Sequence, residues 1–357
     1  MIRLPHSVAT GLLASACALL PAAPPPAGAG RMLQQLESKS WIQQAEALHY
    51  LGEHRVELAI DDVRALLNDK TVHSWIRGRA LLSLSQIENG VDPGEFGKWV
   101  AHDQSALRAA AAEVLELHGG NSATTWIGIL LKDADPVVKC HAAAAHARRK
   151  KEAAWAVVDH LTTAPTPPLA RASARALAFT GNEAALARLG RQLTNPDLMR
   201  ESLRGISEIQ SAVLIPILLN LLPDLEETDL NYGAILTGLQ NQEWKEVTAA
   251  MAEFIKSGDE KRVRTGARLI TTLTRSPELG PPLRAALARA NETETIEAGL
   301  IALGSAAMNP DEHHQFFSKT LKHEESSIRS LSIRCLAHCR EINHYDILRE
   351  SLVDEDP

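Results

Sequence analysis

Residues 130–145 read LLKDADPVVKCHAAAA, and they carry the signals that start a helix. The side-chain oxygen of Asp135 can accept from the free backbone N–H groups of a helix's first turn. Pro136 suits the next position, because it has no N–H to leave unpaired and its fixed φ already matches a helix. The two valines that follow begin an apolar stripe. A similar tetrapeptide, Asp-Glu-Asp-Pro, occurs at residues 354–357, the last four of the sequence.

Apolar residues that follow such helix starts recur at a nearly constant interval along the chain. The tripeptide Ser-Trp-Ile occurs at residues 40–42 and again at residues 74–76, each time opening an amphipathic segment. The anchor residues, spaced 29 to 34 residues apart, are Ile42, Ile76, Leu107, Val138, Leu169, Leu198, Leu230, Val263, Ile296 and Ile328. A period in this range is typical of a solenoid, in which each unit packs only on its neighbours.

Each unit of the repeat contains two amphipathic segments. A small or apolar residue follows the anchor at about the fourth position and another follows one turn later, which gives a helix with one buried face. A second apolar segment lies between successive anchors, as at residues 123–131 and 213–222. Helices this short are marginal alone in water, so they must bury their apolar faces against neighbours. We therefore predict an all-α fold, a right-handed α-solenoid of about ten helix pairs over residues 30–357.

The junctions between units resemble those of bacterial HEAT repeats, in particular the short, phycobilisome-lyase-like kind. Residues 130–145 match best, and residues 351–357 (SLVDEDP) are similar to their start. The basic residue that the family pattern places after the anchor is present as Arg77, Arg108, Lys139, Arg264 and Arg329. The pattern is broken at Ala170, Met199, Asn231 and Glu297. The resemblance covers roughly residues 31–357 and implies a fold rather than an activity, because the family shares architecture more than function.

Composition and charge narrow the classes of partner. Apolar residues make up 45% of the chain, enough for a sizeable core, whereas the formal net charge is −7. Proteins that bind nucleic acid or anionic membranes usually carry a basic stripe. The one dense basic run is residues 148–151, which we interpret as a solvated helix end. We expect no nucleic-acid partner and no integral membrane span.

The first 29 residues have the layout of a secretory signal peptide. Arg3 precedes a largely apolar stretch at residues 8–20, which is too short to span a bilayer. Ala27-Gly28-Ala29 offers a small-residue cleavage site, so we expect cleavage between Ala29 and Gly30 and export to the periplasm, the envelope or the medium. A rival reading places a lipid anchor at Cys17, although the residues before it match a lipoprotein motif poorly.

Residues that could carry chemistry are few. Within the HEAT-like family, deoxyhypusine hydroxylases present several His-Glu dipeptides to two irons, and this sequence has one, His323-Glu324. Cys335 and Cys339 share a helix face with His338 nearby, but zinc sites prefer other spacings. We interpret both cysteines as small core residues. We predict no catalytic residue, no metal ligand and no cofactor.

The candidate partner-binding residues are Trp41, Trp75, Arg77, Arg108, Lys139, Arg264 and Arg329. Both the basic residues and the tryptophans could instead stabilise the fold without contacting a partner. The basic residues could instead form a ladder with acidic residues of the same or the next unit, such as Asp69, Asp103 and Asp133. The tryptophans could instead pack at helix starts, whereas exposed tryptophans would be favoured anchors at an interface.

The sequence predicts a non-catalytic scaffold that presents an extended concave helical surface to another protein. The alternative is an enzyme, or an accessory domain of one, of lyase-like or metal-dependent type. The phrase at residues 354–357 would start another helix, so either the preceding helix is a cap or the chain continues in a longer protein. The identity of the partner is not encoded in any motif.

Overall fold

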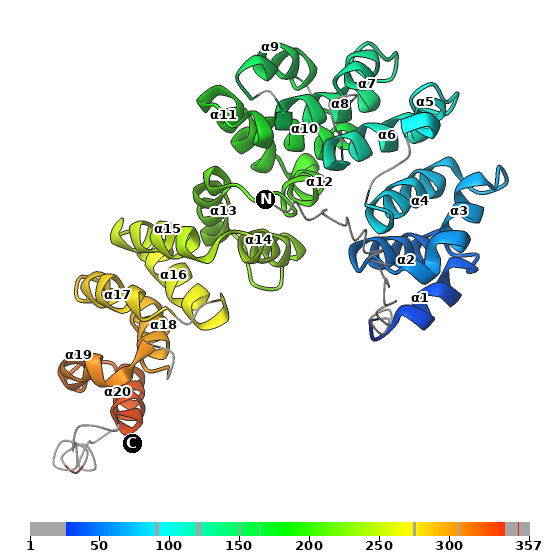
Figure 1. Cartoon of the computed structure of the whole chain (residues 1–357). Helices are drawn as coiled ribbons and strands as arrows, with labels where there is room; N and C mark the ends of the chain where they lie inside the picture. The colour runs from blue at the N-terminus through cyan, green and yellow to red at the C-terminus, as the bar shows by residue number, and fades with distance from the viewer. Residues whose placement is uncertain are drawn as a thin grey trace, which may run out of the picture. The chain divides into compact units, whose positions relative to one another are not determined.

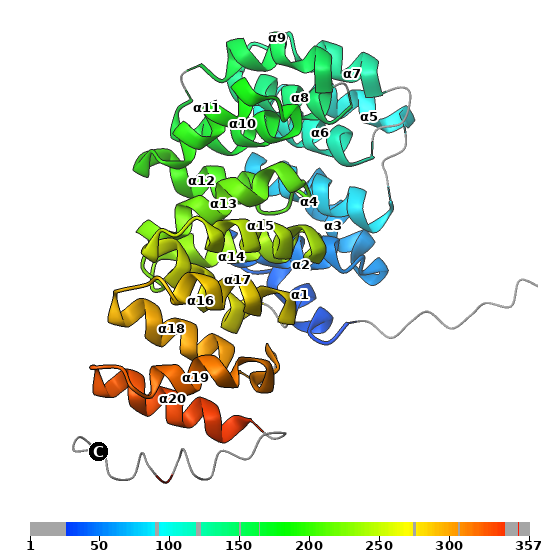
Figure 2. The same cartoon turned by 90° about the vertical axis from the view of Figure 1, so that its left-hand side faces the viewer.

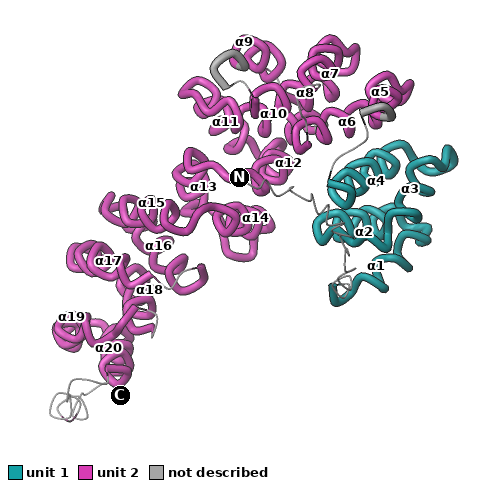
Figure 3. The backbone as a smooth tube through the Cα atoms, viewed as in Figure 1, with its two compact units in different colours: residues 1–91 teal, residues 92–357 magenta. Residues whose placement is uncertain are grey.

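The computed structural model describes residues 26–89, 93–118, 123–149, 151–163, 165–273, 276–305, 308–339 and 349. Within these residues the regular structure is helical, with no strand (Figure 1). The twenty α-helices of the described chain form ten consecutive pairs, which confirms the predicted all-α helical repeat. The chain divides into two compact units, Met1–Val91 and Asp92–Pro357 (Figure 3).

Unit 1 contains two helix pairs. Its helices are α1 (Ala29–Leu36), α2 (Trp41–Glu53), α3 (Ile60–Asn68) and α4 (Ser74–Ile87). Helices α2 and α4 pack side by side, with α1 against α2 and α3 against α4. Leu48 and Leu51 of α2 and Ile76 and Leu81 of α4 are fully buried, and Val63 of α3 is buried as well, so apolar stripes of both even- and odd-numbered helices form the core.

Unit 2 contains the other eight pairs. Its helices are α5 (Pro93–Val100), α6 (Ser105–His118), α7 (Ala123–Leu130), α8 (Pro136–Arg149), α9 (Lys151–Leu161), α10 (Pro167–Thr180), α11 (Glu183–Leu193), α12 (Pro196–Ile206), α13 (Ile215–Leu221), α14 (Leu230–Gln240), α15 (Trp244–Lys256), α16 (Glu260–Leu273), α17 (Gly280–Leu287), α18 (Thr293–Leu303), α19 (His314–Thr320) and α20 (Ser326–His338). Each even-numbered helix packs against the odd-numbered helix before it, and successive pairs stack along the unit (Figure 2).

Acidic N-caps set where two of the even-numbered helices, α8 and α14, begin. Oδ1 of Asp135 accepts from the backbone N–H of Val137 at 2.8 Å, and α8 begins at Pro136 as predicted. Asp229 makes the same contact with Asn231 at 2.7 Å, which starts α14 at Leu230. Such caps satisfy N–H groups that have no partner within the helix. The cap therefore fixes which face of the following helix is buried.

Two of the ten predicted anchors, Leu230 and Ile42, are exposed, because each lies before the third position of its helix. In α8 the buried anchor Val138 is the third residue of the helix. Leu230 is the first residue of α14 and 74% exposed, while Tyr232 takes the buried third position. Ile42 is the second residue of α2 and 50% exposed, whereas Ile76, in the same tripeptide, is the third residue of α4 and is buried.

The middle of unit 2 is packed through small residues. Helix α8 buries four consecutive alanines, residues 142–145, between α6 and α10. Gly205 of α12 faces α10, where an added Cβ would lie 2.5 Å from the carbonyl oxygen of Arg171. Only glycine allows that approach. Alanine and glycine thus bring α6, α8, α10 and α12 close enough for long polar side chains to reach across helices.

The predictions made for the two ends of the chain mostly concern residues outside the described ones. Residues 1–25, including Cys17, lie there, and so do residues 354–357 and, apart from residue 349, the helix expected before them. The predicted cleavage residues Ala29 and Gly30 begin α1, and Ala29 is buried. The hydroxyl of Tyr50 donates to the carbonyl of Ala27 at 2.8 Å.

Within the described residues, no helix has the length and apolar character that crossing a membrane requires.

Candidate functional site

Two tryptophans form an exposed apolar patch on unit 1. Trp41 begins α2, and Trp75 is the second residue of α4, the helix packed beside α2. Their ring centroids lie 5.6 Å apart at an interplanar angle of 85°, an edge-to-face contact. Trp41 and Trp75 nevertheless stay 58% and 42% exposed, and Ile42, next to Trp41 in the chain, is 50% exposed. We call Trp41, Ile42 and Trp75 the tryptophan patch.

The tryptophan patch exists because of where the two helices begin. Ser40 and His73 are the N-cap residues of α2 and α4, and Nδ1 of His73 accepts from the N–H of Trp75 at 3.2 Å. The first residues of a helix lie before its buried stripe is established, so large side chains there project from the end. Both rings therefore meet at the helix starts rather than in the core.

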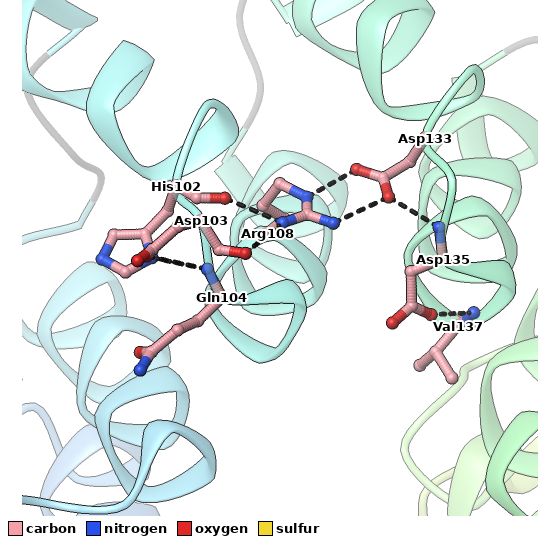
Figure 4. A network of polar contacts seen from close by, with 7 residues as sticks. All are labelled: His102, Asp103, Gln104, Arg108, Asp133, Asp135 and Val137. Atoms are coloured by element: carbon pink, nitrogen blue, oxygen red, sulfur yellow. Dashed lines mark hydrogen bonds and ion pairs between the residues drawn. The ribbon is translucent and has the colours of Figure 1, made fainter.

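Arg108 links two successive repeats of unit 2 (Figure 4). Its Nε and Nη2 donate to the two carboxylate oxygens of Asp133, at 2.6 and 2.9 Å, and its Nη1 donates to the carbonyls of His102 and Asp103. Asp133 also accepts from the N–H of Asp135 at 2.8 Å. The hydrogen bonds from Arg108 hold the pKa of Asp133 below its ordinary value.

This pairing differs in detail from the predicted ladder. The sequence predicted pairing with an acidic residue of the same or the next unit, and it offered Asp103 and Asp133, each a few residues ahead of a basic residue. The structure pairs Arg108 with the carboxylate of Asp133 in the following repeat, and Asp103 contributes only its carbonyl to Arg108. Lys139 contributes to the same site through its charge, which also lowers the pKa of Asp133.

The other predicted basic residues also make contacts within the chain. Arg77 is buried, and its Nε donates to the carbonyl of Leu67 at 2.9 Å. Nη1 of Arg329 donates to the carbonyls of His323 and Glu324, at 3.0 and 2.7 Å. These contacts match those of Arg108 to residues 102 and 103. Arg108 and Arg329 therefore each fasten the loop that precedes their own helix.

Arg264 joins α16 to the start of α18. Its Nη1 lies 3.5 Å from the carboxylate of Glu292 and also pairs with Glu294. Both glutamates are largely exposed. The ladder interpretation thus accounts for Arg108 and Arg264 as contacts between successive repeats.

A buried ion pair on α6 and α10 was not predicted from the sequence. The carboxylate of Glu116 accepts from Nε and Nη2 of Arg175, while Nη1 of Arg175 donates to the carbonyl of Gly205 at 3.1 Å. Both side chains are buried. Arg148 of α8 lies 3.8 Å from Glu116 and places its guanidinium 5.6 Å from the ring centre of Phe179. Burial opposes the charge on Arg175, but Glu116 holds its pKa above the ordinary value.

A buried histidine lies beside this ion pair. Nδ1 of His141 is 3.1 Å from Oε1 of Glu113, but the atoms are not oriented for a hydrogen bond. Burial lowers the pKa of His141, and the nearby charge of Glu113 opposes that shift. Burial therefore favours the neutral imidazole. The signal that could have revealed this cluster is charge on otherwise alanine-rich helix faces: glutamates at 113 and 116, and arginines at 171 and 175.

The C-terminal cysteines are core residues, as the sequence suggested. Sγ of Cys335 donates to the carbonyl of Leu300 at 3.3 Å, and Sγ of Cys339 to the carbonyl of Pro310 at 3.5 Å. Burial raises the pKa of Cys335 to about 11. Across the described residues, no three His, Cys, Asp or Glu side chains gather in a way that could hold a metal ion.

The consecutive helix pairs of its two units make the described chain an all-α helical-repeat protein. No protein-family model matches its sequence, and no curated protein matches it. Among solved structures it is similar to human deoxyhypusine hydroxylase in complex with glycerol, with 20% identity and a TM-score of 0.27. That match covers 81% of this chain and 98% of the other. The assignment of the fold rests on the helix pairs of the chain itself.

Proposed function

We propose that this protein is a non-catalytic scaffold that binds a partner protein through the tryptophan patch of unit 1. The observation that carries the proposal is the contact between Trp41 and Trp75, two large rings that touch each other and remain about half exposed. Exposed apolar clusters of this kind mark interaction surfaces more often than single exposed residues do. A partner would bury both rings.

The tryptophans are suited to supply most of the binding free energy. Tryptophan is enriched among interface residues whose truncation costs about 2 kcal/mol or more. Trp41 and Trp75 already hold each other, so less side-chain freedom is lost when a partner binds. Ile42 extends the apolar surface beside them. The patch can therefore act as a preformed anchor for an apolar side chain of the partner.

The basic residues after the anchors have a different role in this proposal. Arg77 is buried, and Arg108 uses its guanidinium on Asp133 and two carbonyls. A partner could recruit these side chains only by breaking contacts that hold the repeats together. We therefore assign partner contact to Trp41 and Trp75, and assign these arginines to the solenoid itself.

We also propose that the protein acts outside the cytoplasm, after cleavage between Ala29 and Gly30. The support is the basic start, the short apolar stretch and the small residues of positions 1–29. N-terminal sequencing of protein isolated from the native organism tests this. A mature chain that begins at Gly30 agrees with the proposal, whereas an intact Met1 in a cytosolic fraction contradicts it.

The scaffold proposal is tested by affinity purification of the tagged chain from a native envelope extract. We expect one protein to be recovered in near-equal amount with the wild-type chain. The same purification with Trp41→Ala/Trp75→Ala should lose that protein, while Trp244→Ala, which removes a partly exposed tryptophan of unit 2, should retain it. A stoichiometric metal or chromophore on the purified chain, with no partner, would instead favour the enzyme alternative.

A further inference from the structure

A cleft of about 410 Å³ opens in unit 2, at the point where α14 and α16 make few direct contacts. The short helical turn Leu222–Asp224 packs against α16 there. Leu222 and Leu225 supply apolar surface, Tyr232 lines the cleft from α14, and Glu226 lies at its edge. Arg264, Thr265 and Arg268 line it from α16, and Pro223 and Glu294 are the other lining residues.

Two hydroxyl groups line the cleft. The residues Tyr232 and Thr265 are 7% and 8% exposed, and neither side-chain hydroxyl makes a hydrogen bond with another described residue. Both hydroxyl oxygens stay open to solvent within the cleft, where a ligand could replace water. Burial, followed by the charge of Glu227, raises the pKa of Tyr232, so the phenol keeps its proton and can donate. Both groups are therefore ready to bind an acceptor.

Two arginines add donors on the same helix. Arg264 and Arg268 are one turn apart on α16 and both line the cleft. The ionic contacts of Arg264 within the described residues all use Nη1, which leaves Nε and Nη2 available. Nη1 of Arg268 lies 3.3 Å from Glu227, and both of those side chains are about half exposed. Exposed ion pairs contribute only about 0–1 kcal/mol, so a ligand can exchange with these glutamates at low cost.

We propose that this cleft binds a monocarboxylate that carries an apolar body. The carboxylate would accept from Arg264, Arg268 and the hydroxyls of Tyr232 and Thr265, while the apolar body would cover Leu222 and Leu225. Guanidinium groups bind carboxylates through paired hydrogen bonds. This site is separate from the tryptophan patch and does not depend on the proposed scaffold function.

The charges around the cleft favour a ligand with one negative charge over a ligand with two. Glutamates 226, 227, 292 and 294 give four negative charges against two positive charges on Arg264 and Arg268, a local balance of −2. A bound monoanion takes this balance to −3 and a dianion takes it to −4, so the single charge is opposed less. A phosphate dianion would add twice the repulsion at the same place. The site is therefore assigned to carboxylates.

The test is calorimetric titration of the full chain with N-acetyl-leucine and with N-acetylleucinamide. We expect the carboxylate to bind at least about 10-fold more tightly than the amide, which has the same body without the charge. Tyr232→Phe should weaken binding about 5-fold, and Arg268→Gln about 10-fold or more. Arg191→Gln, which removes an exposed arginine of α11, should leave binding unchanged. Thermal unfolding confirms that each variant is folded.

Three results would overturn the assignment. The first is equal binding of the acid and the amide, and the second is no binding of either. The third is tighter binding of a cation, N-acetylargininamide, that is lost in Glu226→Gln. A pentapeptide ending in leucine separates the sources of the carboxylate: tighter binding than N-acetyl-leucine indicates a chain end, and no binding indicates a free acid. Loss of the protein partner in the variants of Trp41 and Trp75 has no bearing on these titrations.

Discussion

Arg175 of α10 and Glu116 of α6 form a buried ion pair between helices that are two repeats apart in the chain. Helix α8 packs against both of them. The pair is possible because α8 buries small residues, among them Ala144 and Ala145, between its two neighbours. Arg175 also reaches the carbonyl of Gly205 on α12. One side chain thus ties α6, α10 and α12 together.

Removing the arginine of this pair should destabilise unit 2 strongly. Arg175→Met leaves the buried carboxylate of Glu116 without its partner, and breaking a buried pair in this way costs about 3–5 kcal/mol. Adding Glu116→Leu removes the stranded charge, so the double variant should recover at least half of the lost stability. Urea unfolding followed by circular dichroism measures both. A double variant as unstable as Arg175→Met would contradict this account.

Arg108 should stabilise the junction between its own repeat and the next. Arg108→Ala breaks two hydrogen bonds to Asp133 and two to backbone carbonyls, and we expect a loss of about 2 kcal/mol in the free energy of unfolding. Arg204→Ala is the control, because Arg204 pairs with Glu201 in an exposed contact worth about 0.5 kcal/mol or less. Equal losses in the two variants would show that the Arg108 contacts add nothing.

Acidic pH should destabilise unit 2 through His141. Burial holds the folded-state pKa of His141 below its ordinary value, although Glu113 opposes the shift, while in the unfolded chain it is about 6.5. As the pH falls below about 6.5, the unfolded state binds this proton first. The stabilisation is therefore complete above that pH and is lost progressively below it. The charges of Arg171 and Arg175 nearby add to the cost of protonation.

The measurement is the free energy of unfolding between pH 7.5 and 5 for the wild-type chain and for His141→Gln. The variant should lose part of the decline that the wild type shows over this range. His49→Gln, at an exposed position of unit 1, should keep the full decline. Identical slopes for wild type and His141→Gln would mean that other groups cause the pH dependence.

The core cysteines should be chemically inert in the folded chain. Burial raises the pKa of Cys140 and of Cys335 to about 11, and only a thiolate reacts readily. In a chain carrying Cys17→Ala, both thiols should react with a thiol reagent at pH 8 about 100-fold or more slowly than in 6 M guanidinium. Rapid labelling of either residue before unfolding would place it at the surface instead.

The sequence predicted the helical repeat well because its signals are local. Asp135 and Pro136 are neighbours, and the cap they form recurs with the period of the fold. The predicted register was wrong where an apolar residue was chosen as the buried anchor although the N-cap places it at the first position of the helix. Asp229 caps α14, which makes Leu230 the first helical residue and moves the buried position to Tyr232.

The polar sites were harder to predict because they depend on contacts between helices. Glu116 and Arg175 are 59 residues apart, and no local pattern pairs them. The edge-to-face contact of Trp41 and Trp75 was also invisible, although both residues were singled out. Spacing places residues on a helix face, but the approach of neighbouring helices decides which faces meet.

The most direct test of the scaffold proposal is the affinity of the purified partner protein for the wild-type chain and for Trp41→Ala/Trp75→Ala, measured by isothermal titration. Two anchor tryptophans worth about 2 kcal/mol each predict a dissociation constant at least about 100-fold larger for the variant. Trp244→Ala should bind like the wild type. An unchanged dissociation constant in a folded double variant would contradict the proposal that the tryptophan patch anchors the partner.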